Sequence, residues 1–264
     1  MTALVLWLGR AMTSADTSGA MVDLSAQSAS FGGSNGLTGY AVRPPGDEPR
    51  PGVVVVHEIF GLDEQARRYA HRLADMGYVV AVPDLFTEGG PRRCLRATFR
   101  ALREQRGRAV QDIAAARQWL LDRDDTTQDV GIIGFCMGGG FALLCAAPRH
   151  GFRVSSVNYG DLPSSPDDLA GACPIVASYG GRDGGLRGAA PKLEYHLTRL
   201  GVQHDVKEYP KAGHAFLSDP DALPWFLAPV TRIAPLGPEP ESAADAWPRI
   251  EAFLAAHLGA PDRR

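Results

Sequence analysis

The sequence contains few cysteines and no histidine spacing typical of a metal site. Among its 264 residues there are four cysteines, and none of them forms a C-x-x-C pair. This usage is typical of a protein in a reducing compartment rather than of a disulfide scaffold. The seven histidines show neither H-x-x-H nor H-E-x-x-H spacing, so we expect no bound metal and no other cofactor.

The chain also lacks a hydrophobic run of the roughly 20 residues that a membrane-spanning helix needs. A short apolar stretch at residues 4–8 is not preceded by Lys or Arg, so we expect no secretory signal and a cytoplasmic location. A formal net charge of -3 and a pI near 6.2 give no electrostatic reason to expect nucleic acid or a membrane as a partner.

What the sequence does contain is an alternation of apolar strand patterns and amphipathic helix patterns. Residues 53–56 are four consecutive valines, which is typical of a strand buried on both faces of a parallel sheet. The alternation predicts an α/β fold, with a doubly wound, mostly parallel sheet and helices on both faces. Other strands are expected at 37–42, 78–84, 130–133, 154–159, 174–179 and 205–209, and helices at 63–76, 190–200, 245–258 and from the basic residues 92–108 into 113–120.

The composition predicts one domain preceded by a tail. Residues 1–30 are rich in Ser, Ala, Thr and Gly without sustained periodicity, so we expect a flexible or loosely packed N-terminal tail. Residues 31–264 show no repeat and no linker of domain-separating composition, which favours a single α/β domain. Within this domain residues 219–242 are rich in Pro and poor in periodicity, as expected of a surface excursion.

One segment, Gly134-Phe135-Cys136-Met137-Gly138, has the G-x-S-x-G pattern of a nucleophile elbow with cysteine in the serine position. An apolar strand pattern leads into it and a helix-forming pattern leads out. Glycines suit a turn in which a strained nucleophile must not be crowded. At a helix N-terminus the Cys136 thiolate would be favoured by the helix dipole. Taken alone, the segment is equally compatible with a buried cysteine that only fills the core.

Three further polar residues each follow a predicted strand, where α/β proteins place their functional sites. They are Glu58, Asp183 and His214. Taken singly, each residue is also compatible with a structural role. Asp183 could form a turn, His214 could occupy a cap or a core position, and Glu58 could cap the next helix. Together with Cys136 they occur in the order nucleophile, acid, histidine that is stated for α/β-hydrolases, and this joint occurrence predicts catalysis.

These segments resemble the dienelactone hydrolase family, which has the α/β-hydrolase fold. The resemblance runs from about residue 37 to residue 258 and implies that Cys136 is the nucleophile, His214 the base and Asp183 its orienting partner. It implies that Glu58 interacts with the resting cysteine and takes part in forming the thiolate. It also implies an oxyanion hole made by the backbone N–H groups of Ile59 and Met137. The matching segments are His57-Glu58-Ile59-Phe60-Gly61, Pro83-Asp84-Leu85-Phe86, Gly134 to Gly139, Gly180-Gly181-Arg182-Asp183 and Gly213-His214-Ala215-Phe216.

The sequence departs from the family where dienelactone-specific members carry arginines that hold the substrate's carboxylate. Glu88 and Ser218 occupy those two places, which removes the reason to expect a small anionic lactone. The resemblance then predicts hydrolysis of a carboxylic ester or lactone through a thioester acyl-enzyme, with a monomer or homodimer as the assembly. Candidate substrate-pocket walls are Phe60, Phe86, Tyr159, Phe216 and Trp225.

Two alternatives of other classes remain open. One is a non-catalytic descendant of the same fold that binds a small ligand, which the complete set of polar residues argues against. The other is a redox enzyme that pairs Cys136 with Cys145 or Cys173. Nine residues separate Cys136 from Cys145, which places Cys145 down the helix and makes a disulfide geometrically unfavourable.

Overall fold

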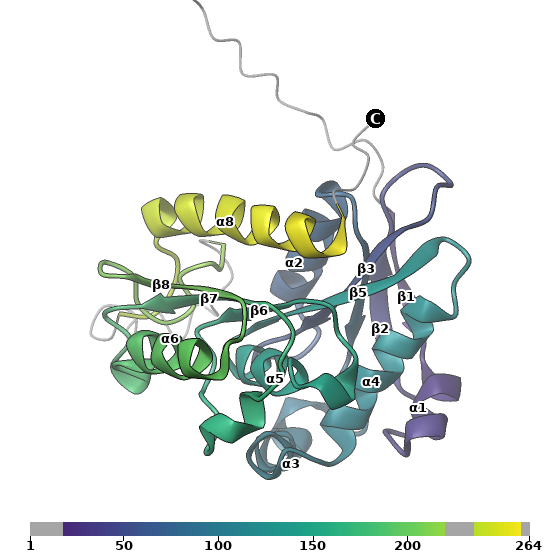
Figure 1. The fold of residues 1–264 in the computed structure, drawn as a ribbon. Coiled ribbons are helices and arrows are strands. Elements are labelled where there is room, and N and C mark those ends of the chain that lie inside the picture. Colours follow the sequence, from purple (N-terminus) through teal and green to yellow (C-terminus); the bar gives the residue numbers. More distant parts are fainter. Residues whose placement is uncertain (1–17, 220–234, 260–264) are drawn as a thin grey trace, which may run out of the picture.

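The protein is a three-layer α/β structure built on one eight-stranded sheet (Figure 1). The computed structural model describes residues 18–219 and 235–259. The strand order is β1-β2-β4-β3-β5-β6-β7-β8, in which β2 pairs antiparallel with both β1 and β4 and all later neighbours pair parallel. The strands are β1 (Gly19–Asp23), β2 (Thr38–Val42), β3 (Arg50–Val56), β4 (Val79–Pro83), β5 (Thr126–Phe135), β6 (Ser155–Asn158), β7 (Ile175–Gly180) and β8 (His204–Tyr209).

Helices cover both faces of the sheet, and the valines of β3 show why. Val53 and Val55 point to one hydrophobic core with helices α2 and α8, whereas Val54 and Val56 point to a second core under the other helices. A central strand that contributes to two cores must be apolar at every position. The helices are α1 (Ser25–Phe31), α2 (Glu64–Asp75), α3 (Gly90–Glu104), α4 (Arg108–Leu121), α5 (Met137–Cys145), α6 (Ala189–Leu200) and α8 (Pro240–Leu258).

The structure differs from the sequence-based prediction in three places. Residues 19–30, expected in a loosely packed tail, form β1 and all but the last residue of α1, and β1 extends the sheet by one edge strand. The basic stretch does not run into the following helix but forms its own helix α3, which ends at Gln105 in the left-handed conformation. Helix α8 begins at Pro240, so the end of the predicted excursion is helical. Residues 220–234 of that excursion lie outside the described residues.

None of the helices within residues 18–219 and 235–259 combines the length and the apolarity that a membrane crossing requires.

A buried carboxylate, Asp112 of α4, fastens the N-terminal segment to the body of the domain. It accepts hydrogen bonds from the Ser34 amide at 2.7 Å, the Ser34 hydroxyl at 2.6 Å and the Ser28 hydroxyl at 3.2 Å. Burial raises the pKa of this carboxyl, and the bonds from Ser34 and Ser28 oppose that rise. Three donors on one buried acceptor explain how a segment with little apolar sequence becomes ordered.

We predict that Asp112→Ala lowers the free energy of unfolding by about 2–4 kcal/mol, because it leaves several buried donors without an acceptor. Urea denaturation monitored by circular dichroism measures the change. Asp124→Ala, which removes an exposed carboxyl near the end of the same helix, is the control and should change stability by less than about 0.5 kcal/mol. Equal effects of the two substitutions would show that Asp112 is not a structural anchor.

Candidate active site

Cys136 occupies a strained turn between β5 and α5. Its φ of 55° and ψ of -120° fall in a region that residues with a side chain rarely adopt. The neighbouring glycines make the turn possible: a Cβ on Gly134 would lie 1.9 Å from the Gly138 carbonyl oxygen, and one on Gly138 would lie 2.1 Å from the Val56 oxygen. The chain therefore tolerates no side chain at either position, and the turn presents the Cys136 sulfur at the end of the sheet.

Asn158, the last residue of β6, holds the turn from the side. Its carbonyl oxygen accepts a hydrogen bond from the Cys136 amide at 3.1 Å, and its side-chain amide donates to the Gly134 carbonyl at 3.2 Å. The side chain is fully buried. Both contacts stabilise the strained backbone around Cys136, so Asn158 is a supporting residue that the sequence pattern did not single out.

Asp183 and His214 come from loops that follow β7 and β8 and meet beside Cys136. His214 Nδ1 lies 2.6 Å from Asp183 Oδ2, and Asp183 Oδ1 accepts from the Gly185 amide at 3.0 Å. Burial opposes charge on His214, but its hydrogen bonds to Asp183 and to Cys136 outweigh this effect and raise its pKa to about 10. The pKa of Asp183 is lowered, since its bond to His214 and the amide bonds overcome desolvation.

Glu58 follows β3 and interacts electrostatically with His214. Its Oε1 accepts a hydrogen bond from the Tyr159 hydroxyl at 3.3 Å. Desolvation raises the pKa of Glu58 to about 7; attraction to His214 and the bond from Tyr159 lower it, whereas Asp63 adds to the rise. The Tyr159 ring in turn meets His214 edge-on, with centroids 5.2 Å apart. Glu58 therefore changes charge in the neutral pH range, close to the Cys136–His214 pair.

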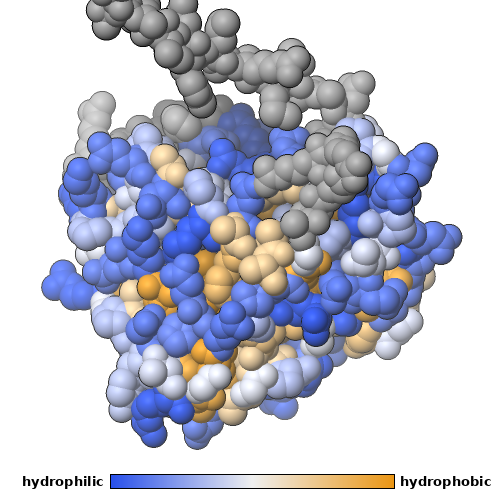
Figure 2. Space-filling view, turned by 45° about the horizontal axis from the view of Figure 1, so that its top comes forward, coloured by the Kyte–Doolittle hydropathy of each residue, from blue (hydrophilic) through white to orange (hydrophobic). Residues whose placement is uncertain are grey.

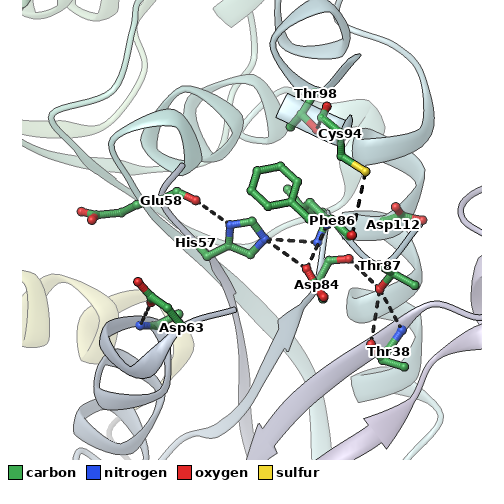
Figure 3. Close-up of polar contacts among 12 residues, drawn as sticks. Thr38, His57, Glu58, Asp63, Asp84, Phe86, Thr87, Cys94, Thr98 and Asp112 are labelled. Atoms are coloured by element: carbon green, nitrogen blue, oxygen red, sulfur yellow. Dashed lines mark hydrogen bonds and ion pairs between the residues drawn. The ribbon is translucent and has the colours of Figure 1, made fainter. Parts of the chain in front are cut away.

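His57 fixes the direction of the peptide bond between Glu58 and Ile59 (Figure 3). The buried ring accepts from the Leu85 amide at Nε2, 3.1 Å away, so its Nδ1 carries the proton and donates to the Glu58 carbonyl at 2.7 Å. Burial lowers the pKa of His57, consistent with a neutral ring. In a trans peptide the N–H points away from the C=O, so the Ile59 N–H is directed away from His57. Figure 3 also shows the Glu58 carboxyl turned away from the ring.

The amides of Ile59 and Met137 are the two proposed oxyanion donors. Within the described part of the chain neither makes a backbone hydrogen bond, and Met137 is the first residue of α5, where amides have no helical partner. Among the described residues both amides are thus without a backbone acceptor.

Glu88 and Ser218, at the two places where arginines were considered, are both engaged elsewhere. The Glu88 carboxylate pairs with Arg108 and accepts the Asn35 amide at 2.9 Å. The Ser218 hydroxyl lies 3.2 Å from the Tyr69 hydroxyl in the interior. Neither position supplies a cation to the site.

The aromatic residues named as pocket walls lie in different environments. Phe86 packs against His57 at 5.0 Å between centroids, and Phe216 packs against Tyr159 at 5.6 Å. Phe86, Phe216 and Tyr159 are at most 3% exposed, so they support the site from within, whereas Phe60 is partly exposed. Trp225 lies outside the described residues. Figure 2 shows apolar side chains gathered in a patch among hydrophilic ones on the face that it presents.

The other cysteines do not share the environment of Cys136. Burial raises the pKa of Cys145 and of Cys173 to about 12, and the Cys94 thiol lies 3.8 Å from the Phe86 carbonyl oxygen. All four cysteines are free thiols. Among residues 18–219 and 235–259 no group of three His, Cys, Asp or Glu side chains is arranged to hold a metal ion.

Comparison with known proteins gives a consistent result. The model of the dienelactone hydrolase family matches residues 37–258. A Yersinia pestis protein named "Putative carboxymethylenebutenolidase" is 30% identical over 230 residues, which cover 79% of each chain. A Methylorubrum extorquens protein of the same name is 29% identical over 233 residues, 81% of this chain and 75% of that protein. A crystal structure from Klebsiella pneumoniae, "Putative Dienelactone Hydrolase", covers 90% of this chain and 99% of its own, with a TM-score of 0.72 and 25% identity.

The raised pKa of Glu58 predicts a pH-dependent cost of folding. Between the ordinary glutamate pKa of 4.5 and about 7 the folded protein keeps the proton that the unfolded chain has lost, so stability falls as pH rises through this window. Glu58→Gln should abolish this fall. The free energy of unfolding of the variant relative to that of the wild type should therefore increase by up to about 3 kcal/mol from pH 5 to pH 8. Urea denaturation at both pH values measures the gain. The exposed Glu64→Gln serves as the matched control and should retain the wild-type difference.

Proposed function

The chain belongs to the dienelactone hydrolase family and is a hydrolase acting on esters or lactones, and from this premise we propose that it works through a Cys136–His214–Asp183 triad. The observation that supports the proposal is the position of the His214 ring, whose Nδ1 lies 2.6 Å from Asp183 Oδ2 and whose interaction with Cys136 helps to raise the pKa of the ring. A histidine with these two partners can take the thiol proton and remain charged near neutral pH.

In the proposed reaction Cys136 loses its proton to His214, and the thiolate attacks the carbonyl carbon of the ester or lactone. The resulting oxyanion accepts hydrogen bonds from the Ile59 and Met137 amides, each worth on the order of 3 kcal/mol. His214 returns the proton to the departing alkoxide, which leaves a thioester on Cys136. His214 then takes a proton from water, the hydroxide displaces the thiolate from the acyl group, and the acid is released.

Asp183 and Glu58 have different parts in this scheme. Asp183 stays ionised, holds the His214 tautomer and stabilises its charge. The Glu58 carboxylate attracts the same imidazolium, because the attraction that lowers the pKa of Glu58 also favours the charged form of His214. Activity should therefore rise with pH as Glu58 ionises near its pKa of about 7.

We predict that Cys136→Ala lowers kcat for a short-chain p-nitrophenyl ester by at least about a thousandfold, since no nucleophile remains. The release of p-nitrophenolate measures turnover. Cys173→Ala, which removes a partly exposed thiol outside the triad, is the control and should retain activity. Mass spectrometry of the wild-type protein quenched during turnover should find the acyl group on the Cys136 peptide. Full activity of Cys136→Ala would eliminate the proposed mechanism.

The substrate we propose is a carboxylic ester or lactone without a charged group near its carbonyl. The support is electrostatic: Glu88 is an anion already paired with Arg108, and Ser218 is a neutral hydroxyl directed to Tyr69. A carboxylate on the substrate would lose its hydration without gaining a cation at either place.

This assignment predicts a preference that a substrate panel can measure. The value of kcat/KM for neutral lactones and aryl esters should exceed that for cis- and trans-dienelactone, which carry a carboxylate, by about tenfold or more, the cost of a missing charged hydrogen bond. Ser218→Arg should reduce this preference, whereas Ser30→Arg on exposed α1 should leave it unchanged. Faster hydrolysis of dienelactone than of every neutral substrate would contradict the prediction.

A further inference from the structure

A row of buried hydroxyl groups leads away from Glu58. The Tyr159 hydroxyl lies 3.3 Å from Glu58 Oε1, the Tyr69 hydroxyl lies 3.4 Å from that of Tyr159, and the Ser218 hydroxyl lies 3.2 Å from that of Tyr69. All three side chains are buried. They come from the loop after β6, from helix α2 and from the loop after His214, so only the folded chain assembles them.

The donor and acceptor in each of these hydrogen bonds follow from the contact between Tyr159 and Glu58. The Tyr159 hydroxyl has one proton, which it donates to the Glu58 carboxyl, so at the contact between the two tyrosines Tyr69 is the donor. Tyr69 then accepts from Ser218. Gln65 also bonds the Tyr69 hydroxyl, while its own Oε1 accepts the Asp219 amide at 3.3 Å. The hydroxyl dipoles thus all point toward Glu58, an arrangement in which each bond strengthens the next.

The two tyrosine rings in this row of hydroxyl groups are held firmly. Tyr69 stacks on Phe135 with centroids 3.7 Å apart and an angle of 8°, next to the Cys136 turn. Tyr159 has a positive φ of 41°, and its amide donates to the Ser178 carbonyl at 2.8 Å. A backbone held in a strained conformation is typical of residues whose position matters for function.

We propose that Tyr69, acting through Tyr159, is a positioning residue that holds Glu58 beside the Cys136–His214 pair and stabilises its ionised form. This inference rests on the proposed function, in which ionised Glu58 favours the charged His214. At the place of Ser218, where a cation was considered, the protein uses a neutral chain of donors. Neutral donors stabilise the Glu58 carboxylate less than a cation would, which leaves this carboxyl free to titrate near neutrality.

Other charged and titratable groups also act on Glu58, and their effects must be distinguished from the effect of the hydrogen-bonded hydroxyl groups. Asp63, at the start of α2, opposes ionisation of Glu58, and His214 favours it. Cys136 interacts with Tyr159. None of these groups is altered when the Tyr69 hydroxyl is removed, so the substitution isolates the contribution of the hydrogen-bonded hydroxyl groups to the ionisation of Glu58.

The test is the pH dependence of kcat/KM for a neutral p-nitrophenyl ester in Tyr69→Phe, which keeps the stacked ring and loses the hydroxyl. The acidic limb should move to higher pH, with kcat/KM about fivefold lower at pH 6 and nearly unchanged at pH 9. Tyr159→Phe should move the limb further, and Glu58→Gln should remove it. Ser218→Ala should produce a smaller shift than Tyr69→Phe and no additional shift in the double variant, because the chain is then already interrupted.

A second readout and two controls make the outcomes distinct. The pH dependence of iodoacetamide labelling at the Cys136 peptide should shift in parallel with the acidic limb. Tyr40→Phe removes a hydroxyl that also contacts α2, through His71 at 2.9 Å, and should leave the limb unchanged. If Tyr69→Phe and Ser218→Ala both superimpose on the wild type while Cys136→Ala is inactive, the inference fails and the proposed function stands. If Cys136→Ala remains active, the proposed function itself fails.

Discussion

The site depends on a close backbone contact between the first turn of α5 and the ends of two neighbouring strands. A Cβ on Gly138 would lie 2.1 Å from the Val56 oxygen, and one on Gly139 would lie 2.5 Å from the Asn158 oxygen. Because the helix approaches so closely, Cys136 lies between the loops that follow β3 and β6. Those loops carry Glu58 and Tyr159, so the packing that strains the turn also brings the polar groups to it.

Two carboxylic acids near one histidine are held in opposite electrostatic environments. Asp183 accepts from His214 and from a backbone amide, and its pKa is lowered. Glu58 accepts from one tyrosine hydroxyl, and desolvation raises its pKa to about 7. Environments that separate two pKa values in this way assign different parts to the two acids: one keeps its charge, and the other changes charge in the working range.

Supporting residues do much of the positioning around these groups. His57 orients the Glu58–Ile59 peptide, Asn158 holds the Cys136 turn, and Tyr69 and Ser218 extend the hydrogen bonds of Glu58 into the interior. The contacts of Ser218 and of Glu88 also show that the places considered for arginines are not vacant. Each of these two residues belongs to a hydrogen-bonded arrangement. The electrostatics of this site therefore differ from those expected with arginines at the two places through several contacts, and not only through the loss of two charges.

Local patterns located the parallel core strands to within a few residues, because the four valines of β3 and similar apolar runs identify strands buried on both faces. The sequence also indicated which residues follow those strands, and so named Cys136, Glu58, Asp183 and His214. It missed β1, an edge strand whose half-exposed residues have no apolar pattern. It also merged α3 with α4, because the one glycine at the break, Gly107 with its φ of 110°, is a residue that a helical pattern can tolerate singly. The meeting of Tyr69, Tyr159 and Ser218 could not be predicted, since contacts across as many as 149 residues depend on packing that no local pattern records.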